Sequence, residues 1–324
     1  MDTGNINAAK IKSFLGRTES IIFMATLVLM LISYFVNDAF FSRYNMSTLL
    51  RTMSFVAIVG IGQTMVLLLG DIDLSVGAIA CLTSIVAGTL MVDMAIPPVA
   101  ACLLGLLLGA ICGGLNGFLI TRFKINAFII TLANSTIYEG LVYVITQGSP
   151  VLNIPDQLAF LGKGMVLDFF SAPLLIMLGL AAVVCFVLKM TPFGRHLYAI
   201  GGNETASKLV GIRVERTRLL IFMLSGVFGA IAGLLMMLRL QAAQPTIGIG
   251  WLMPSITAAV LGGTSMSGGR GNVVGTIFGA LLTTVISNAI VIMHISTYLE
   301  NVVTGAVVII AVLADALRVQ LRKG

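Results

Sequence analysis

Charged residues are scarce in this sequence, since only 10% of its 324 residues are Asp, Glu, Lys or Arg and 58% are apolar. Globular proteins carry about a quarter charged residues. The composition therefore excludes an ordinary soluble domain and predicts a protein of the lipid bilayer. No polar stretch exceeds about thirty residues, well below the usual domain size, so no separate soluble domain is expected.

Cysteine and histidine are also few, with four and two residues. The cysteines Cys81, Cys102, Cys112 and Cys185 all lie in apolar runs without metal-ligand spacing, which argues against a zinc site or a disulfide framework. The phosphate-loop motif G-x-x-x-x-G-K-[ST] is absent. We therefore expect no metal or cofactor in this chain, and any nucleotide chemistry must belong to another chain.

What is present instead is a series of long apolar segments. A spanning helix needs about twenty apolar residues. Ten segments meet or nearly meet this length, and the count falls to eight if the short pairs around 70 and 270 enter the membrane without crossing it. The ten predicted segments are 20–37, 50–69, 74–92, 97–120, 126–146, 172–189, 217–238, 251–268, 271–292 and 298–316.

The positions of Lys and Arg predict the orientation, because positively charged loops are retained in the cytoplasm. With both termini inside, all but four basic residues face the cytoplasm, and the exceptions are Arg43, Arg51, Lys163 and Arg239. The net charge of +6 is spread over short loops, which argues against nucleic-acid binding. We expect a cytoplasmic segment 1–19, one transmembrane domain 20–316 and a cytoplasmic tail 317–324.

The largest cytoplasmic interruption is residues 190–217. Asn203 is a suitable N-cap for a short helix that ends at Gly211. Such a helix could be held by a cytoplasmic partner. A solvated loop whose arginines only fix orientation is the alternative, and charge alone favours it.

Two carboxylates interrupt the apolar sequence at residues 70–77 (Gly-Asp-Ile-Asp-Leu-Ser-Val-Gly). Asp73 is expected to cap the following helix. A broken helix at this depth would line an aqueous path, because free backbone groups are tolerated only beside protein or water. A tight turn between two helices is an equally good reading, and a metal site is disfavoured because no third ligand is near in the sequence.

Two further polar stretches stand out. Residues 262–271 combine glycines with Thr264 and Ser265, which predicts a helix-packing seam or a hinge more than a phosphate cradle. Residues 240–250 carry Gln241, Gln244 and Thr246, neutral hydrogen-bonding groups that suit a hydroxylated solute but would also occur in any outer loop.

Glu139 is the only acidic residue deep inside an otherwise uninterrupted apolar segment. An intramembrane carboxylate is a functional candidate, facing a cavity or a partner. A position near the outer interface is the alternative.

Four motifs occur in one order along the chain: residues 70–77; residues 194–204 (Gly-Arg-His-Leu-Tyr-Ala-Ile-Gly-Gly-Asn-Glu); residues 243–246 (Ala-Gln-Pro-Thr); and residues 261–265 (Leu-Gly-Gly-Thr-Ser). Together they resemble the permease subunit of bacterial ribose-type monosaccharide ABC importers, over about residues 40–317. The resemblance implies an all-α polytopic fold with two inverted repeats. It also implies a permease that moves a sugar by alternating access across the inner membrane.

The resemblance further implies partners: a second permease copy or close paralogue, an ATPase chain that binds ATP and Mg²⁺, and a periplasmic sugar-binding protein. Membrane lipid surrounds the assembly. The residues expected to couple to the ATPase are Gly194, Arg195, Gly201, Gly202, Asn203, Glu204, Ser207, Lys208 and Leu209. Those expected to line the path or gate are Asp71, Asp73, Ser75, Glu139, Gln244, Thr246, Thr264 and Ser265.

The sequence departs from the family pattern in three places. Asp71 stands where the family usually has glycine, Glu139 where relatives often have arginine, and no acidic residue lies near Met253 and Pro254. Two rival functions follow from the carboxylates. An ion-coupled secondary transporter would use Asp71, Asp73 or Glu139 as proton carrier, and a membrane enzyme would use the two aspartates as acid and base.

Overall fold

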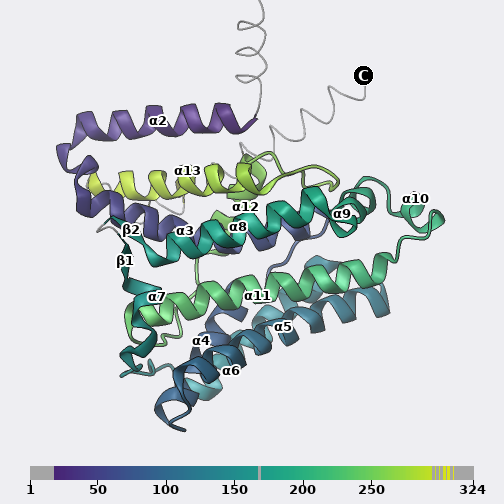
Figure 1. Cartoon of the computed structure of the whole chain (residues 1–324), viewed down its shortest axis with the longest axis horizontal. Coiled ribbons are helices and arrows are strands. Elements are labelled where there is room, and N and C mark those ends of the chain that lie inside the picture. The colour runs from purple at the N-terminus through teal and green to yellow at the C-terminus, as the bar shows by residue number, and fades with distance from the viewer. Residues whose placement is uncertain are drawn as a thin grey trace, which may run out of the picture.

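The computed structural model describes residues 18–166 and 169–293, together with isolated positions between 296 and 309. Figure 1 shows helices that lie roughly side by side, with α2 at one edge and α6 at the other. The longer helices are α2 (Thr18–Val36), α3 (Arg43–Leu68), α4 (Val76–Val92), α5 (Pro98–Phe123), α6 (Ala127–Thr146), α8 (Ala172–Met190), α11 (Val214–Leu240), α12 (Leu252–Leu261) and α13 (Val273–Ile292). The predicted all-α membrane fold is confirmed.

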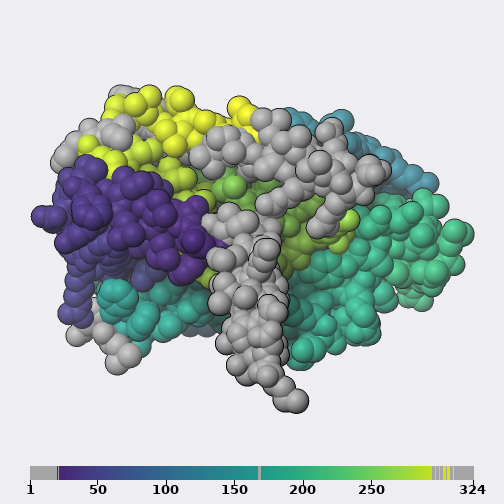
Figure 2. Space-filling model, turned by 90° about the horizontal axis from the view of Figure 1, so that it is seen from above, coloured from purple at the N-terminus to yellow at the C-terminus, as the bar shows by residue number. Residues whose placement is uncertain are grey.

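Short elements form the connections. A 3-10 turn, η1 (Asp38–Phe41), joins α2 to α3. The connection between α6 and α8 holds η2 (Asp156–Leu158), α7 (Ala159–Lys163) and the antiparallel strands β1 (Met165–Val166) and β2 (Phe170–Ser171). The polar loop after α8 folds as α9 (Pro192–Gly202) and α10 (Glu204–Leu209), and Figures 1 and 2 place this region at one end of the molecule.

Six of the described helices are long and apolar enough to cross a bilayer, namely α3, α5, α6, α8, α11 and α13. The predicted segment 251–268 is helical only over Leu252–Leu261, which is too short to span alone. The predicted segment 298–316 and the terminal segments 1–17 and 317–324 lie outside the continuously described residues. The count of ten spans therefore stays a prediction.

The core forms around α3. In the most apolar 18-residue stretch of α3, 83% of the residues are buried, against 22% in the corresponding stretch of α6. The outer helices bury one face and expose apolar side chains on the other, as Leu103, Leu107 and Ile111 do on α5. These three residues are four apart, so they lie on one face of the helix. Such an exposed apolar stripe is what a lipid-facing helix requires.

Small residues bring α5 and α11 into close contact. Gly109, Gly113 and Gly117 repeat every four residues on α5, the spacing that lets transmembrane helices approach. A Cβ at Gly109 would lie 2.6 Å from the Cβ of Ala230, and one at Gly117 would lie 2.7 Å from the Cα of Leu219. Any side chain here would force the two helices apart. This seam was not among the sequence-based predictions, although its glycine spacing is visible in the sequence.

Candidate functional site

Two segments of the bundle join non-helical backbone to a helix that is shorter than the six long apolar ones, and they are called the interrupted crossings below. The first consists of residues 69–75 followed by α4, and the second of residues 241–251 followed by α12. The second interruption was predicted as an outer loop, but it packs along α4. A Cβ at Gly88 would lie 2.9 Å from the Cβ of Ala243, and a Cβ at Gly77 would lie 2.7 Å from the carbonyl oxygen of Gly248.

The two contacts fix how far this segment enters the bundle. Gly88 and Gly77 are eleven residues apart on α4, which corresponds to about 16 Å along the helix axis. Residues 243–248 therefore run along α4 from near its carboxyl end to its first turn. Irregular backbone at such depth is tolerated only where it is buried in protein or lines a water-filled cavity. The interrupted crossings meet where α4 begins.

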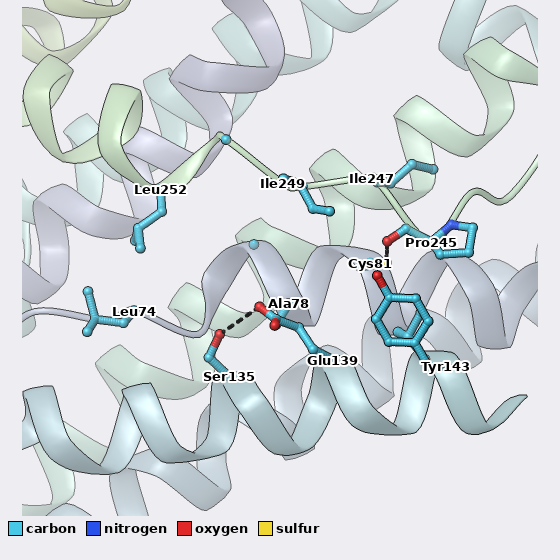
Figure 3. Close-up of a pocket in the computed structure, with 14 residues that line it drawn as sticks. Leu74, Ala78, Cys81, Ser135, Glu139, Tyr143, Pro245, Ile247, Ile249 and Leu252 are labelled. Atoms are coloured by element: carbon cyan, nitrogen blue, oxygen red, sulfur yellow. Dashed lines mark hydrogen bonds between the residues drawn. The ribbon is translucent and has the colours of Figure 1, made fainter. Parts of the chain in front are cut away.

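A cavity of about 270 Å³ lies at this meeting point (Figure 3). Leu74, Gly77, Ala78 and Cys81 line it from the first crossing, and Pro245, Leu252 and the residues 247–250 line it from the second. The third wall is α6, which contributes Ser135, Glu139, Val142 and Tyr143. Among the described residues that line the cavity, Glu139 is the only charged one, and most of the others are apolar.

Glu139 points toward the cavity in Figure 3, and its Oε1 lies 3.3 Å from the donating hydroxyl of Ser135. Tyr143 lies one turn further along the same face of α6. Glu139 is exposed to solvent in the single chain. The structure thus favours the interpretation in which Glu139 faces a cavity. The cavity offers a carboxylate, a hydroxyl and a phenol, groups that bind hydroxylated solutes.

Gln244 and Thr246 lie beside the cavity rather than in its lining. The carbonyl oxygens of Gln244 and Pro245 lie 3.7 Å and 3.3 Å from the Cys81 sulfur. The hydroxyl of Thr246 is exposed and lies 3.5 Å from the side-chain oxygen of Gln244. The neighbouring residues Pro245, Ile247 and Gly248 line the cavity in their place.

Asp73 is fully buried at the start of the first interrupted crossing. Its Oδ1 accepts hydrogen bonds from the backbone N–H of Ser75 at 2.9 Å and from the Ser75 hydroxyl at 2.7 Å. Its Oδ2 accepts from the hydroxyl of Ser225 on α11 at 2.7 Å. The expected cap is thus shifted: Ser75 occupies the N-cap position of α4, and Asp73 binds the N–H just ahead of the helix.

The network around Asp73 extends across the bundle. The side-chain amide of Asn116 on α5 donates to the Ser75 hydroxyl at 2.7 Å, and that of Asn134 on α6 donates to Asn116 at 2.6 Å. Gln63 on α3 donates to the backbone carbonyl of Asp73. Asp73 forms no ion pair within the described part of the chain. Hydrogen bonds from four helices therefore hold the interruption in place.

Thr264 and Ser265 lie elsewhere, in the turn between α12 and α13, where both are buried. This turn meets the beginning of the first interruption: the N–H of Gly269 donates to the carbonyl of Leu68 at 2.9 Å, and a Cβ at Gly70 would lie 3.4 Å from the carbonyl oxygen of Ser267. The residues predicted for the path are therefore scattered: Glu139 lines the cavity, Gln244 and Thr246 lie beside it, Asp73 and Ser75 form the buried network, Thr264 and Ser265 lie in this turn, and Asp71 pairs with Arg218.

The predicted coupling helix is present as α10. Asn203 is its N-cap and accepts a hydrogen bond from the N–H of Ala206 at 2.9 Å. Leu209 is 84% exposed, and Val210 directly after the helix is 76% exposed. Two adjacent apolar side chains thus project from the end of the molecule.

The other residues predicted for coupling differ in accessibility. Arg195, Gly202 and Lys208 are exposed, whereas Gly194 and Ser207 are buried. Gly194 packs against the backbone of Leu188, and Gly201 against the backbone of Leu68 and Gly269. The buried members therefore shape the loop, and only the exposed ones can contact a partner.

The carboxylate of Glu204 joins α10 to α11. Its Oε1 accepts from Lys208 at 2.7 Å, and its Oε2 accepts from Arg218 at 2.9 Å. The hydrogen bond from Lys208, aided by Arg218, lowers the pKa of Glu204. Arg218 also donates to Asp71 at 2.7 Å.

Sequence reasoning missed several of these residues. From the sequence alone Arg218 indicates only the orientation of its loop, and no local pattern singles out Asn116, Asn134 or Ser225. Each is a polar side chain within or beside a predicted span, and such side chains in a membrane helix usually find partners in the bundle. The first turn of α9, where Thr191 is the N-cap and Pro192 follows, was also missed although this order is a common helix start.

Comparison with known proteins places the chain in a family. Residues 45–312 match the family model described as "Branched-chain amino acid transport system / permease component". The ribose import permease of Haemophilus influenzae is 39% identical over 90% of this chain and 91% of its own length, and that of Bacillus subtilis is 40% identical with the same coverage. The fructose import permease of Rhizobium meliloti is 34% identical over 94% of this chain and 88% of its own length.

No solved structure matches the chain. The relatives are named as permeases, and their similarity confirms the resemblance given by the four ordered motifs. The chain is therefore a multi-pass membrane protein that belongs to the permease-component family containing the ribose import permeases, and it is a transport component rather than an enzyme.

Proposed function

We propose that this chain is the permease of an ABC importer that moves a ribose-type monosaccharide across the inner membrane by alternating access. The observation that carries the proposal is the cavity where the two interrupted crossings meet, with Glu139, Ser135 and Tyr143 on one wall. Interrupted helices that meet within a bundle are a common way of building a solute site in transporters. A hydroxylated solute matches the acceptors of this wall.

Alternating access requires that segments around the cavity move as units. The interrupted crossings support such movement. In each of them a long helix is connected to a shorter helix by irregular backbone, which can serve as a hinge. The long helix α3, the interruption 69–75 and the short helix α4 are paralleled by α11, the interruption 241–251 and α12. In the proposed orientation α3 and α11 run in opposite directions. This relation supports two inverted repeats and ten crossings, with 298–316 as the last.

The energy source is proposed to be a separate ATPase chain that binds ATP and Mg²⁺. The absence of a phosphate-loop motif from the sequence supports this division, as does a relative named as a probable ABC transporter permease. The exposed residues Leu209 and Val210 are the proposed contact with the ATPase. Apolar side chains exposed outside the membrane commonly mark a protein interface.

Two further partners complete the proposed assembly. A second copy of this chain, or a close paralogue, is proposed on the strength of the resemblance to the importer permeases. A periplasmic sugar-binding protein would deliver the solute at the opposite end from α10. Both termini are placed in the cytoplasm, following the distribution of Lys and Arg.

Uptake by proteoliposomes tests this function. The permease, its ATPase and its binding protein are reconstituted, and accumulation of labelled ribose, fructose and allose is measured with and without ATP. We expect accumulation of at least one sugar that needs ATP and the binding protein and that persists with an uncoupler. An ATPase partner unable to hydrolyse ATP is the matched control. Uptake that is independent of ATP and abolished by the uncoupler would instead identify an ion-coupled transporter.

A further inference from the structure

Arg218 connects two segments that are far apart in the sequence. It lies near the start of α11, with a side chain that is 16% exposed. Its Nε donates to Oδ2 of Asp71 at 2.7 Å, and its Nη2 donates to Oε2 of Glu204 at 2.9 Å. One guanidinium group therefore holds a carboxylate of α10 and a carboxylate of the first interrupted crossing.

At α10, Glu204 is held by further contacts besides the one with Arg218. Glu204 is the first residue of α10, and its second oxygen accepts a hydrogen bond from Lys208 one turn later at 2.7 Å. Lys208 also lies 3.6 Å from Glu215, at the start of α11. A displacement of α10 must therefore displace the Glu204 carboxylate, which is one of the two hydrogen-bond partners of Arg218.

At the other partner of Arg218, Asp71, the chain continues toward the cavity. Asp71 follows Gly70, whose positive φ of +80° turns the chain at the end of α3. Two residues later Asp73 is anchored by Ser75 and Ser225, and α4 then begins with the residues that line the cavity. Asp71 is thus the first anchored side chain of a short segment that ends at the cavity wall.

The chemistry of arginine fits this position better than that of lysine. A guanidinium group is planar and presents several donors in fixed directions, whereas an ammonium group is a single point charge on a flexible stem. The surroundings form a polar hollow of about 440 Å³ that is lined by Asp71, Lys124, Glu204, Lys208, Glu215 and Arg218. Asp71 and Arg218 are largely shielded, at 17% and 16% exposure, so their attraction is less screened than that of a surface pair.

We propose that Arg218 is a positioning residue that transmits movement of α10 to the interrupted crossing through Asp71. This inference rests on the proposed function, because it requires that an ATPase move α10. Arg218 touches neither ATP nor sugar. It sets the position of residues 71–78 relative to α10, and so it links hydrolysis at the ATPase to the shape of the cavity.

The test compares Arg218→Lys with Arg122→Lys in the reconstituted importer at matched membrane levels. Arg122 is an exposed arginine near the end of α5, outside the network formed by Arg218. For Arg218→Lys we expect sugar imported per ATP hydrolysed to fall about fivefold or more while ATP hydrolysis continues. Asp71→Asn should act in the same direction, and the double variant should be no worse than the poorer single variant.

A second readout separates transmission from stability. Cysteines are placed at Ile72 or Thr205 in a protein whose four natural cysteines are replaced by alanine. In the otherwise unchanged importer, ATP should alter the labelling rate at both positions, and Arg218→Lys should retain the change at Thr205 but lose it at Ile72. Unchanged coupling in Arg218→Lys, or an ATP response at Ile72 that survives it, would overturn the proposal. Failure of the parent importer to use ATP would instead overturn the proposed function.

Discussion

Asp73 shows how a single buried carboxylate can organise an interrupted helix. Its oxygens accept three hydrogen bonds, two from Ser75 and one from Ser225, at 2.7–2.9 Å. A buried acceptor of this kind contributes mainly because its donors have no other partner nearby. The role of Asp73 is therefore expected to depend on its acceptor oxygens more than on its ability to exchange a proton.

Two substitutions at Asp73 separate these roles. Asp73→Asn retains an acceptor for Ser75 and should preserve most ATP-driven uptake. Asp73→Leu leaves the Ser75 and Ser225 donors unsatisfied, at a cost of about 1–3 kcal/mol for each buried group, and should lower both uptake and the unfolding temperature. Uptake by proteoliposomes at matched protein levels is the measurement. An Asn variant as inactive as the Leu variant would support a proton-carrying role and contradict the acceptor account.

The sequence predicted single residues unevenly. Asn203 was identified as an N-cap because its preference is local, and the structure confirms it. The predicted cap, Asp73, lies two residues before the observed N-cap of α4, Ser75, and tertiary hydrogen bonds to α5 and α11 hold both residues in place. Arg218 could not be assigned a partner, because Asp71 is 147 residues away in the chain.

At the scale of elements, the interruption 241–251 is where sequence reasoning differed most from the structure. Its Gln, Thr, Pro and Gly residues are typical of an exposed loop. Their place along α4 depends on Gly77 and Gly248, whose lack of side chains lets two backbones approach. The long helices were predicted well, because twenty apolar residues are a strong local signal, whereas close backbone contacts depend on residues far apart in the chain.

Gly77→Val tests this contact. The added side chain would meet the Gly248 carbonyl, since even a Cβ would lie 2.7 Å from that oxygen. Overpacking of this kind typically costs about 1–3 kcal/mol. We expect the variant to insert in the membrane but to lose most ATP-driven uptake. Gly179→Ala on α8 is the control, because its added Cβ would meet no atom within 4 Å apart from its chain neighbours and the backbone of its own helix. Equal uptake by both variants would show that the contact does not matter for transport.

At the scale of the whole molecule, a series of contacts connects the end that carries α10 to the cavity. The tip of α10 exposes Leu209 and Val210, Glu204 connects α10 to Arg218, and Arg218 connects to the interrupted crossing that begins at Asp71. That crossing ends at the cavity wall. Membership of the permease family was predictable from four ordered motifs, but this series of contacts was not, since it joins segments distant in sequence.

The central claim is that sugar passes through the cavity beside Glu139. Ser135 lines that cavity and is replaced by cysteine with little change in size, in a protein whose natural cysteines are replaced by alanine. A charged thiol reagent reacts with a thiolate and therefore needs water at the site. The matched control is Gly179→Cys on the exposed, apolar face of α8.

The deciding measurement is ATP-driven sugar uptake by Ser135→Cys before and after treatment with the charged reagent. We expect the reagent to abolish uptake through Ser135→Cys, to leave Gly179→Cys unaffected, and to react more slowly at position 135 when the importer is turning over its sugar. Full uptake by Ser135→Cys after complete modification at that position would contradict the claim that this cavity is the sugar path.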